Sequence, residues 1–337
     1  MRHSPLCFLL IAVLSACSAN SETGDAATPD AGAQADGGNP VDGGADAGAP
    51  AVDAGWQDDF TVELLPGDPP QFKLGYETAA ENPFDIGEVE VKAEIRRPSG
   101  AVDNVRGFWY QGYNFTQDPQ SGLEVAAIKG APHFRVRYRA VEDGRHLIRF
   151  TAAEGGKTLA HGFEAYDLKA WKGVYAGVNA ANAQYFGLDD GAPFFPIGFN
   201  IGWSGTHGLY DYEHYVHRLA AAGGNWFRMW MIKWSNGLEW SAGKGVGDYK
   251  GLGRYALDNA SRIDEILDYA ESNGVKVQLT FGSYLENTEG GTWNEGSWSE
   301  NPYNAQNGGP CADAGAFFTD ATAQSLYKHR HSYIVAR

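Results

Sequence analysis

The chain has 337 residues, of which 43% are hydrophobic and 13% aromatic, so it can bury a sizeable core and is expected to hold about two domains of roughly 100 to 200 residues each. Its formal net charge of −16 argues against nucleic-acid binding, because nucleic-acid-binding proteins present a basic patch. Over half of the imbalance lies in residues 18–59, which hold nine Asp or Glu and no Lys or Arg, so the charge says little about any site.

The N-terminus has the pattern of an export signal. The apolar run of residues 6–14 follows a basic start and is too short to cross a bilayer as a helix. The junction LSAC at 14–17 resembles a bacterial lipobox, in which cleavage before Cys17 is followed by lipidation of that residue; the alternative is an ordinary signal peptide with a chance cysteine. We therefore expect residues 1–17 to be a lipoprotein signal peptide and a lipidated Cys17 to hold the protein on a membrane surface. The lipobox resemblance associates Ser18 after the cysteine, in place of Asp, with the outer membrane, so the outer membrane or the cell surface is the expected location.

Residues 18–57 are almost wholly Ala, Gly, Asp, Asn and Pro, and they show no apolar periodicity. Such a segment cannot bury enough surface to offset its chain entropy, so we expect a disordered linker. Its expected role is a charged tether between the lipid and the folded part.

Residues 58–170 are predicted to form an immunoglobulin-like β-sandwich. Short runs alternate apolar and polar residues with period two, and PSG, EDG and EGG clusters mark turns between them. The domain is either a carbohydrate-binding module or a structural spacer, and its cluster of Trp109, Tyr110 and Tyr113 is either a binding face or core and domain interface. The runs are 60–65, 71–77, 87–96, 105–113, 133–140, 145–153 and 158–166.

Residues 171–337 change to the strand and helix alternation of a parallel sheet, and they predict the first three β/α units of an incomplete (β/α)8 TIM barrel. The strands are expected at Phe194–Trp203, at 226–232 and at 275–281. The helices follow them, the last from about residue 316. The first helix is predicted to bury Tyr215, Val216, Leu219 and Ala222, and the second Ile263, Ile266, Leu267 and Ala270.

Alternation within the three strands separates a polar face from an apolar one, because successive side chains point to opposite sides. The polar face suits a barrel lumen and the apolar face a layer of covering helices. The polar face holds Gly198, Asn200, Trp226, Arg228, Trp230, Gln278 and Thr280. The apolar face holds Ile197, Phe199, Ile201, Phe227, Met229, Met231, Val275, Val277 and Leu279.

Arg228 lies in the middle of an apolar run, where an arginine is rare unless its guanidinium is paired. The three strands offer no carboxylate on their polar face. Arg228 therefore either forms a structural salt bridge or orients a catalytic carboxylate supplied from further along the chain.

The segments 194–203 (FFPIGFNIGW), 225–231 (NWFRMWM), 275–281 (VKVQLTF), 301–304 (NPYN) and 331–337 (HSYIVAR) resemble cellulase-like glycoside hydrolases of the large (β/α)8 clan. Within that clan the chain is similar to proteins with an N-terminal β-sandwich of the family called domain of unknown function 5060. The sandwich likeness rests mainly on GFWYQGY and FRVRYRAVEDGRHLIRF.

The resemblance implies a retaining mechanism with one Glu after strand four and one after strand seven, so both catalytic residues are expected beyond Arg337 and the chain resembles a C-terminally truncated member. Asn200 and Arg228 would support the surroundings of the nucleophile, and no cofactor or metal is implied. The expected substrate-binding residues are Trp203, Trp230, Trp234, Trp293, Trp298, Asn301, Tyr303 and Asn304. The loop acids Glu239, Glu286, Glu289, Glu295 and Glu300 are interpreted as solvated charge.

These observations favour an exported, lipid-anchored glycoside hydrolase acting on a β-glycan polysaccharide, with a second polypeptide as one way to complete the barrel. The alternative is a non-catalytic surface lipoprotein that binds carbohydrate. A metal-dependent hydrolase is less favoured, because His214 and His217, although close in sequence to His207, fall on a helix expected outside the barrel.

Overall fold

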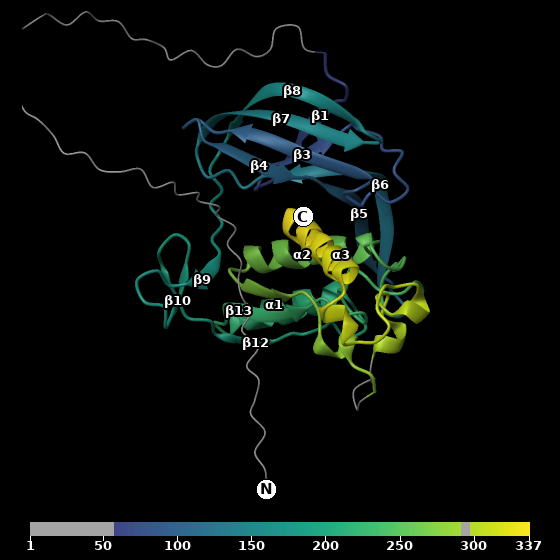
Figure 1. Ribbon diagram of the computed structural model, residues 1–337. Coiled ribbons are helices and arrows are strands. Elements are labelled where there is room, and N and C mark those ends of the chain that lie inside the picture. Colours follow the sequence, from purple (N-terminus) through teal and green to yellow (C-terminus); the bar gives the residue numbers. More distant parts are fainter. Residues whose placement is uncertain (1–56, 291–296) are drawn as a thin grey trace, which may run out of the picture. The chain divides into compact units, whose positions relative to one another are not determined.

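The computed structural model describes residues 57–290 and 297–337. In these residues two antiparallel sheets are followed by a small meander and then by a three-stranded parallel sheet with helices (Figure 1). The predictions for Cys17, for most of the linker, for Trp293 and for Glu295 lie outside the described residues.

The first eight strands form two four-stranded antiparallel sheets, ordered β1-β2-β6-β5 and β4-β3-β7-β8. Their inner faces share one apolar core, in which Phe72 of one sheet lies 5.2 Å from Phe150 of the other between ring centroids. This agrees with the predicted pair of sheets; the immunoglobulin-like topology stays a prediction. The bounds are β1 Val62–Leu65, β2 Gln71–Leu74, β3 Val89–Arg96, β4 Val102–Arg106, β5 Phe108–Gln117, β6 Glu124–Arg137, β7 Gly144–Glu154 and β8 Lys157–Leu168.

Two features of the sheets differ from the sequence prediction. The expected run 105–113 is divided at Gly107 between β4 and β5, which belong to different sheets. A Cβ at Gly107 would lie 2.6 Å from the side chain of Val91, so glycine permits the close passage from one sheet to the other. Strand β6 also begins at Glu124, before the predicted 133. The sequence prediction missed residues 124–132 because they lack the period-two alternation that marks a strand.

The predicted strand Phe194–Trp203 is also divided. Phe194 belongs to β11 (Pro193–Phe194) and pairs with Phe186 in a meander with β10 (Phe186–Leu188) and β9 (Ala176–Val178). The parallel strand β12 is only Gly198–Asn200. Pro196 lies between the two strands, and proline cannot donate to a strand ladder.

The parallel sheet has the order β12-β13-β14, with β13 at Trp226–Trp230 and β14 at Lys276–Thr280. Helix α1 (Leu209–Ala221) connects the first two strands and helix α2 (Leu257–Ser272) the next two. Three parallel strands joined by helices confirm the expected β/α order for this segment, while closure into a barrel stays a prediction.

The helices bury most of the predicted stripes. Val216 and Leu219 of α1 and Ile263, Ile266 and Ala270 of α2 are buried, with Leu267 half-buried. On α1 the buried face is shifted by about one turn: Leu209 and Tyr212 are buried, whereas Tyr215 is half-buried and Ala222 exposed.

The predicted apolar face of the sheet is covered only in part. Phe227 and Met229 of the central strand are fully buried under the helices. Ile197 and Phe199, which were expected to be covered as well, are 62% and 51% exposed. They lie at and beside β12, a short edge strand, whereas Ile201, just beyond it on the same face, is buried in the core.

Glu124 at the start of β6 joins the two-sheet part to both helices. Its carboxylate accepts a hydrogen bond from the backbone N–H of Leu209 at 2.6 Å and another from Nε of Arg262 at 2.8 Å. The side chains of Glu124 and Arg262 are each 8% exposed. One buried carboxylate thus caps α1, where it also meets the positive end of the helix dipole, and fixes α2.

The aromatic cluster of β5 belongs to the same junction. Trp109 packs against Phe134, and its carbonyl accepts a hydrogen bond from the hydroxyl of Tyr333 at 2.9 Å. Tyr110 lies under the guanidinium of Arg135. Trp109 and Tyr110 therefore belong to the core and the domain interface, which confirms the second of the two alternatives for these two residues.

Among the described residues after β14, four short 3₁₀ helices precede helix α3 (Ala321–Ala336). Within residues 57–290 and 297–337, no helix has the length and apolar character needed to span a bilayer.

Candidate functional site

The candidate site lies at the carboxyl ends of β12, β13 and β14, because parallel sheets bind ligands at that edge. The side chains of Phe227, Met229, Val277 and Leu279 pack on the helix side. Asn200, Arg228 and Gln278 form one cross-strand row on the opposite side. The predicted division into an apolar and a polar face is therefore confirmed for β13 and β14.

Arg228 and Asn200 are brought together by this register. The Nε–H of Arg228 donates to Oδ1 of Asn200 at 3.0 Å. The Arg228 guanidinium carbon also lies 5.5 Å from the ring centroid of Trp230, close enough for a cation–π contact. Among the described residues, the partner of Arg228 is thus a neutral amide and a ring rather than a carboxylate, and its side chain is half-buried rather than fully enclosed.

Three of the predicted sugar-binding tryptophans gather beside this pair. Trp203 lies 5.7 Å from Trp230 and 6.2 Å from Trp234 between ring centroids, edge to face in both cases. Trp203 follows β12, Trp230 ends β13, and Trp234 lies in the loop beyond. Trp203 is 41% exposed and the other two are half-buried. We call these three residues the tryptophan shelf.

The other predicted substrate-binding residues lie elsewhere and are enclosed. Trp298 and Tyr303 are 4% and 2% exposed and pack in an apolar cluster with Phe317. Asn301 donates its side-chain N–H to the carbonyl of Glu286 at 2.8 Å, and Asn304 donates to the carbonyl of Trp298 at 2.9 Å. Their polar groups hold this loop together, so contact of these four residues with a sugar has no support from their surroundings and stays a prediction.

Glu239, in the loop after β13, is fully buried, so its interpretation as solvated charge is wrong. Its carboxylate accepts hydrogen bonds from the backbone N–H of Gly253 at 2.6 Å and from the hydroxyl of Tyr303 at 3.0 Å. Nη1 of Arg330, on α3, lies 3.4 Å away. Burial raises the pKa of Glu239, and the Arg330 charge and these hydrogen bonds oppose that rise.

Glu286 is the second buried acid, so the solvated interpretation is wrong here too. It lies on the 3₁₀ helix η1 (Tyr284–Asn287) shortly after β14 and is 9% exposed. Burial raises its pKa to about 7, the charge of Arg330 opposes the rise, and that of Glu239 adds to it. A carboxyl group with such a pKa can take up and release a proton at neutral pH.

The remaining loop acids differ from these two. Glu289 is exposed. Glu300 forms an ion pair with Nζ of Lys233 at 2.9 Å, which ties its loop to the loop after β13. Sequence reasoning missed the burial of Glu239 and Glu286 because the covering residue Arg330 is far along the chain, and no local spacing marks them.

The histidines do not form a metal site in the described part of the chain. His207 pairs with Asp211 at 3.2 Å, while His214 and His217 are exposed on α1. No group of three metal-ligating side chains is found among residues 57–290 and 297–337.

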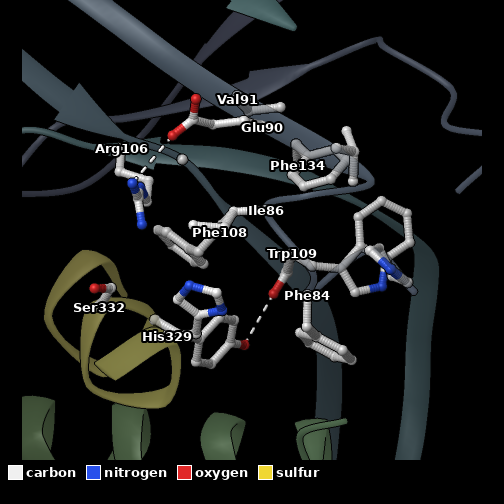
Figure 2. A pocket seen from close by; sticks show the side chains of 14 residues that line it. Phe84, Ile86, Glu90, Val91, Arg106, Phe108, Trp109, Phe134, His329 and Ser332 are labelled. Atoms are coloured by element: carbon white, nitrogen blue, oxygen red, sulfur yellow. Dashed lines mark hydrogen bonds and ion pairs between the residues drawn. The ribbon is translucent and has the colours of Figure 1, made fainter. Parts of the chain in front are cut away.

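A small pocket lies between the two-sheet part and α3 (Figure 2). Phe84, Ile86, Phe108 and Trp109 line it together with His329 of α3, and it contains none of the predicted site residues. Its cavity volume is about 30 Å³, whereas small-molecule sites enclose roughly 300 to 1,000 Å³. It is therefore a packing gap at the junction.

Comparison with known proteins gives no family assignment: no family model and no curated protein matches the chain. Similar solved structures include a protein from Bacteroides vulgatus ATCC 8482 whose assignment as a glycoside hydrolase is provisional, with 15% identity and a TM-score of 0.38 over 62% of this chain and 39% of that one. They also include β-glucuronidases from Parabacteroides merdae (10% identity, TM-score 0.20, 65% and 22% covered) and Ruminococcus gnavus (13% identity, TM-score 0.21, 83% and 36% covered).

The chain therefore spans less than half the length of each of these proteins. All three are similar to it only distantly, and TM-scores below 0.5 carry no argument about its activity. The resemblance to the family called domain of unknown function 5060 stays a prediction from the sequence.

Proposed function

We propose that this chain binds a polysaccharide at the carboxyl ends of its parallel strands and belongs to a glycoside hydrolase that acts on a β-glycan. The observation that carries the proposal is the tryptophan shelf beside the Arg228–Asn200 pair. Flat sugar faces pack on aromatic rings, and nearby N–H donors fix the sugar hydroxyls. The shelf offers one exposed ring and two rings that hold it in place.

The hydrolytic part of the proposal rests on the sequence resemblance. A retaining mechanism needs two carboxyl groups about 5 to 5.5 Å apart across the scissile bond. In the described residues, the loop acids Glu239 and Glu286 are buried beside Arg330. Neither is proposed as the nucleophile or the acid/base. We propose that carboxylates outside the described residues, or from a second polypeptide, would supply those roles.

A non-catalytic surface protein that binds carbohydrate is the second candidate. The burial of both loop acids supports this candidate, because Glu239 and Glu286 are 3% and 9% exposed and so are closed to a substrate in the described residues. Both candidates require glycan binding at the shelf, and they differ in whether bound oligosaccharide is cleaved.

The cellular location belongs to the same proposal. Export with a lipidated Cys17, followed by a charged tether over residues 18–57, would place the folded part outside the cytoplasm near polymeric substrates. Its support is the sequence pattern of residues 1–57 alone.

The shelf is tested by titrating the full chain with soluble β-glycan oligosaccharides in a calorimeter. Trp203→Ala should weaken binding about tenfold, which corresponds to the roughly 1.4 kcal/mol that one aromatic contact can supply. Trp171→Ala is the matched control, since Trp171 packs on Tyr175 outside the parallel sheet. Equal affinities of wild type and Trp203→Ala would refute the site. Release of reducing sugar in the same samples separates hydrolase from binder.

A further inference from the structure

The polar face of the parallel sheet carries positive charge and no negative charge. Its side chains are those of Asn200, Trp226, Arg228, Trp230, Lys276, Gln278 and Thr280, since Trp226 pairs with Lys276 and Arg228 with Gln278 in register.

Three of the described acids in the loops beyond these strands already have a cationic neighbour. Glu239 lies against Arg330, and Glu300 pairs with Lys233. Burial raises the pKa of the Glu286 carboxyl group, and the charge of the same Arg330 opposes that rise. Within residues 57–290 and 297–337, neither Arg228 nor Lys276 has an ion pair with any of them.

The Arg228 guanidinium is held on one side, and among the described residues its two terminal nitrogens are free to bind a ligand. Its Nε bonds Asn200 and its plane lies near Trp230, while in the described part of the chain its two terminal nitrogens have no hydrogen-bond partner. Parallel N–H groups on an arginine fork match a planar carboxylate in a bidentate pair. The neighbouring Trp203 ring is 41% exposed and offers a stacking surface.

We propose that the sugar bound at the tryptophan shelf is anionic, with its carboxylate on the terminal nitrogens of Arg228, as in a uronic acid residue of an acidic polysaccharide. This inference rests on the proposed glycan binding and specifies its substrate class. A sulfate ester could supply the same charge, but its tetrahedral group matches the planar fork less well than a carboxylate.

The test uses the full chain and two oligosaccharides that differ only at C6, one with a carboxylate and the other with the hydroxymethyl group obtained by reducing it. The acidic sugar should bind at least about tenfold more tightly at 50 mM NaCl, since a hydrogen-bonded charge is worth that factor or more. The advantage should shrink at 500 mM NaCl, where partly exposed charges are screened.

Arg228→Gln should abolish the preference for the acidic sugar over the neutral one. Arg228→Lys should keep part of it, since the charge remains and the fork is lost. Lys276→Gln is the matched control: it removes an equal charge from the same face, two residues toward the amino ends of the strands, and should keep the preference. Far-UV circular dichroism and thermal unfolding check that each variant folds.

Each outcome decides the question. Equal binding of the two sugars, or an equal loss in Arg228→Gln and Lys276→Gln, overturns the assignment of the carboxylate to Arg228. Tighter binding of a C6-sulfated analogue than of the uronate overturns the choice of a carboxylate. If both sugars bind equally and Trp203→Ala weakens both, the shelf stands and only this inference fails. Absence of binding by either sugar refutes the shelf and this inference with it.

Discussion

The buried carboxyl group of Glu286 should make the stability of the protein depend on pH, and replacing Glu286 by Gln should remove that dependence. The pKa of Glu286 is raised from 4.5 to about 7, chiefly by burial. A carboxyl group whose pKa is raised in the folded state binds its proton more tightly there than in the unfolded chain. Its contribution to stability is therefore complete below pH 4.5 and is lost as the pH rises to about 7.

The magnitude follows from the shift. One pKa unit corresponds to 1.36 kcal/mol, so the free energy of unfolding should fall by about 3 kcal/mol between pH 4.5 and neutral pH because of Glu286. Gln is neutral at every pH and has nearly the same shape as the protonated acid. Glu286→Gln should match the wild type at pH 4.5 and be more stable by up to about 3 kcal/mol at pH 8.

Urea denaturation followed by tryptophan fluorescence at several pH values measures this difference. Glu239 also has a raised pKa and makes the stability of both the wild type and Glu286→Gln depend on pH. The difference between the two curves of stability against pH therefore reports Glu286 together with its coupling to Glu239. Glu289→Gln, at an exposed position of the same loop, is the control and should leave the curve unchanged. A Glu286→Gln protein that is less stable than the wild type by the same amount at every pH would refute the reasoning.

Two further predictions concern the buried Glu124 contact and the N-terminal signal. Glu124→Ala should lower the free energy of unfolding by about 3 to 5 kcal/mol, because it leaves Arg262 buried without its carboxylate and uncaps α1. Glu124→Gln should lower the free energy of unfolding by less. If urea denaturation shows a decrease below about 1 kcal/mol for Glu124→Ala, the contact contributes little to stability. Cys17→Ser should move the protein from the detergent-extracted membrane fraction of a bacterial host to the soluble fraction, and an unchanged distribution would contradict lipidation.

The parts of the fold that were predictable are those whose information is local. Val216 with Leu219 and Ile263 with Ile266 follow the helical period, and the alternation around Arg228 separates the two faces of the central strand. Each of these patterns is complete within a few residues. The division at Pro196 and the short strands before it were missed because two- and three-residue strands carry almost no periodic signal.

The site was less predictable because burial there is decided by residues far apart in the chain. Nothing near Glu239 shows that Tyr303 and Arg330 will cover it, 64 and 91 residues away. An aromatic residue in a loop also has the same sequence signature whether it becomes core or platform. Trp298 and Trp203 were therefore given the same role, and the structure places one in a core and the other at the surface.

The most direct test of the account is the affinity of the full chain for a soluble acidic oligosaccharide before and after Trp203→Ala, measured by calorimetry beside Trp171→Ala. The account predicts binding by the wild type and by Trp171→Ala, and a loss of about tenfold in Trp203→Ala. A wild-type chain that binds no acidic or neutral glycan, or a Trp203→Ala variant that binds as tightly as the wild type, would contradict it.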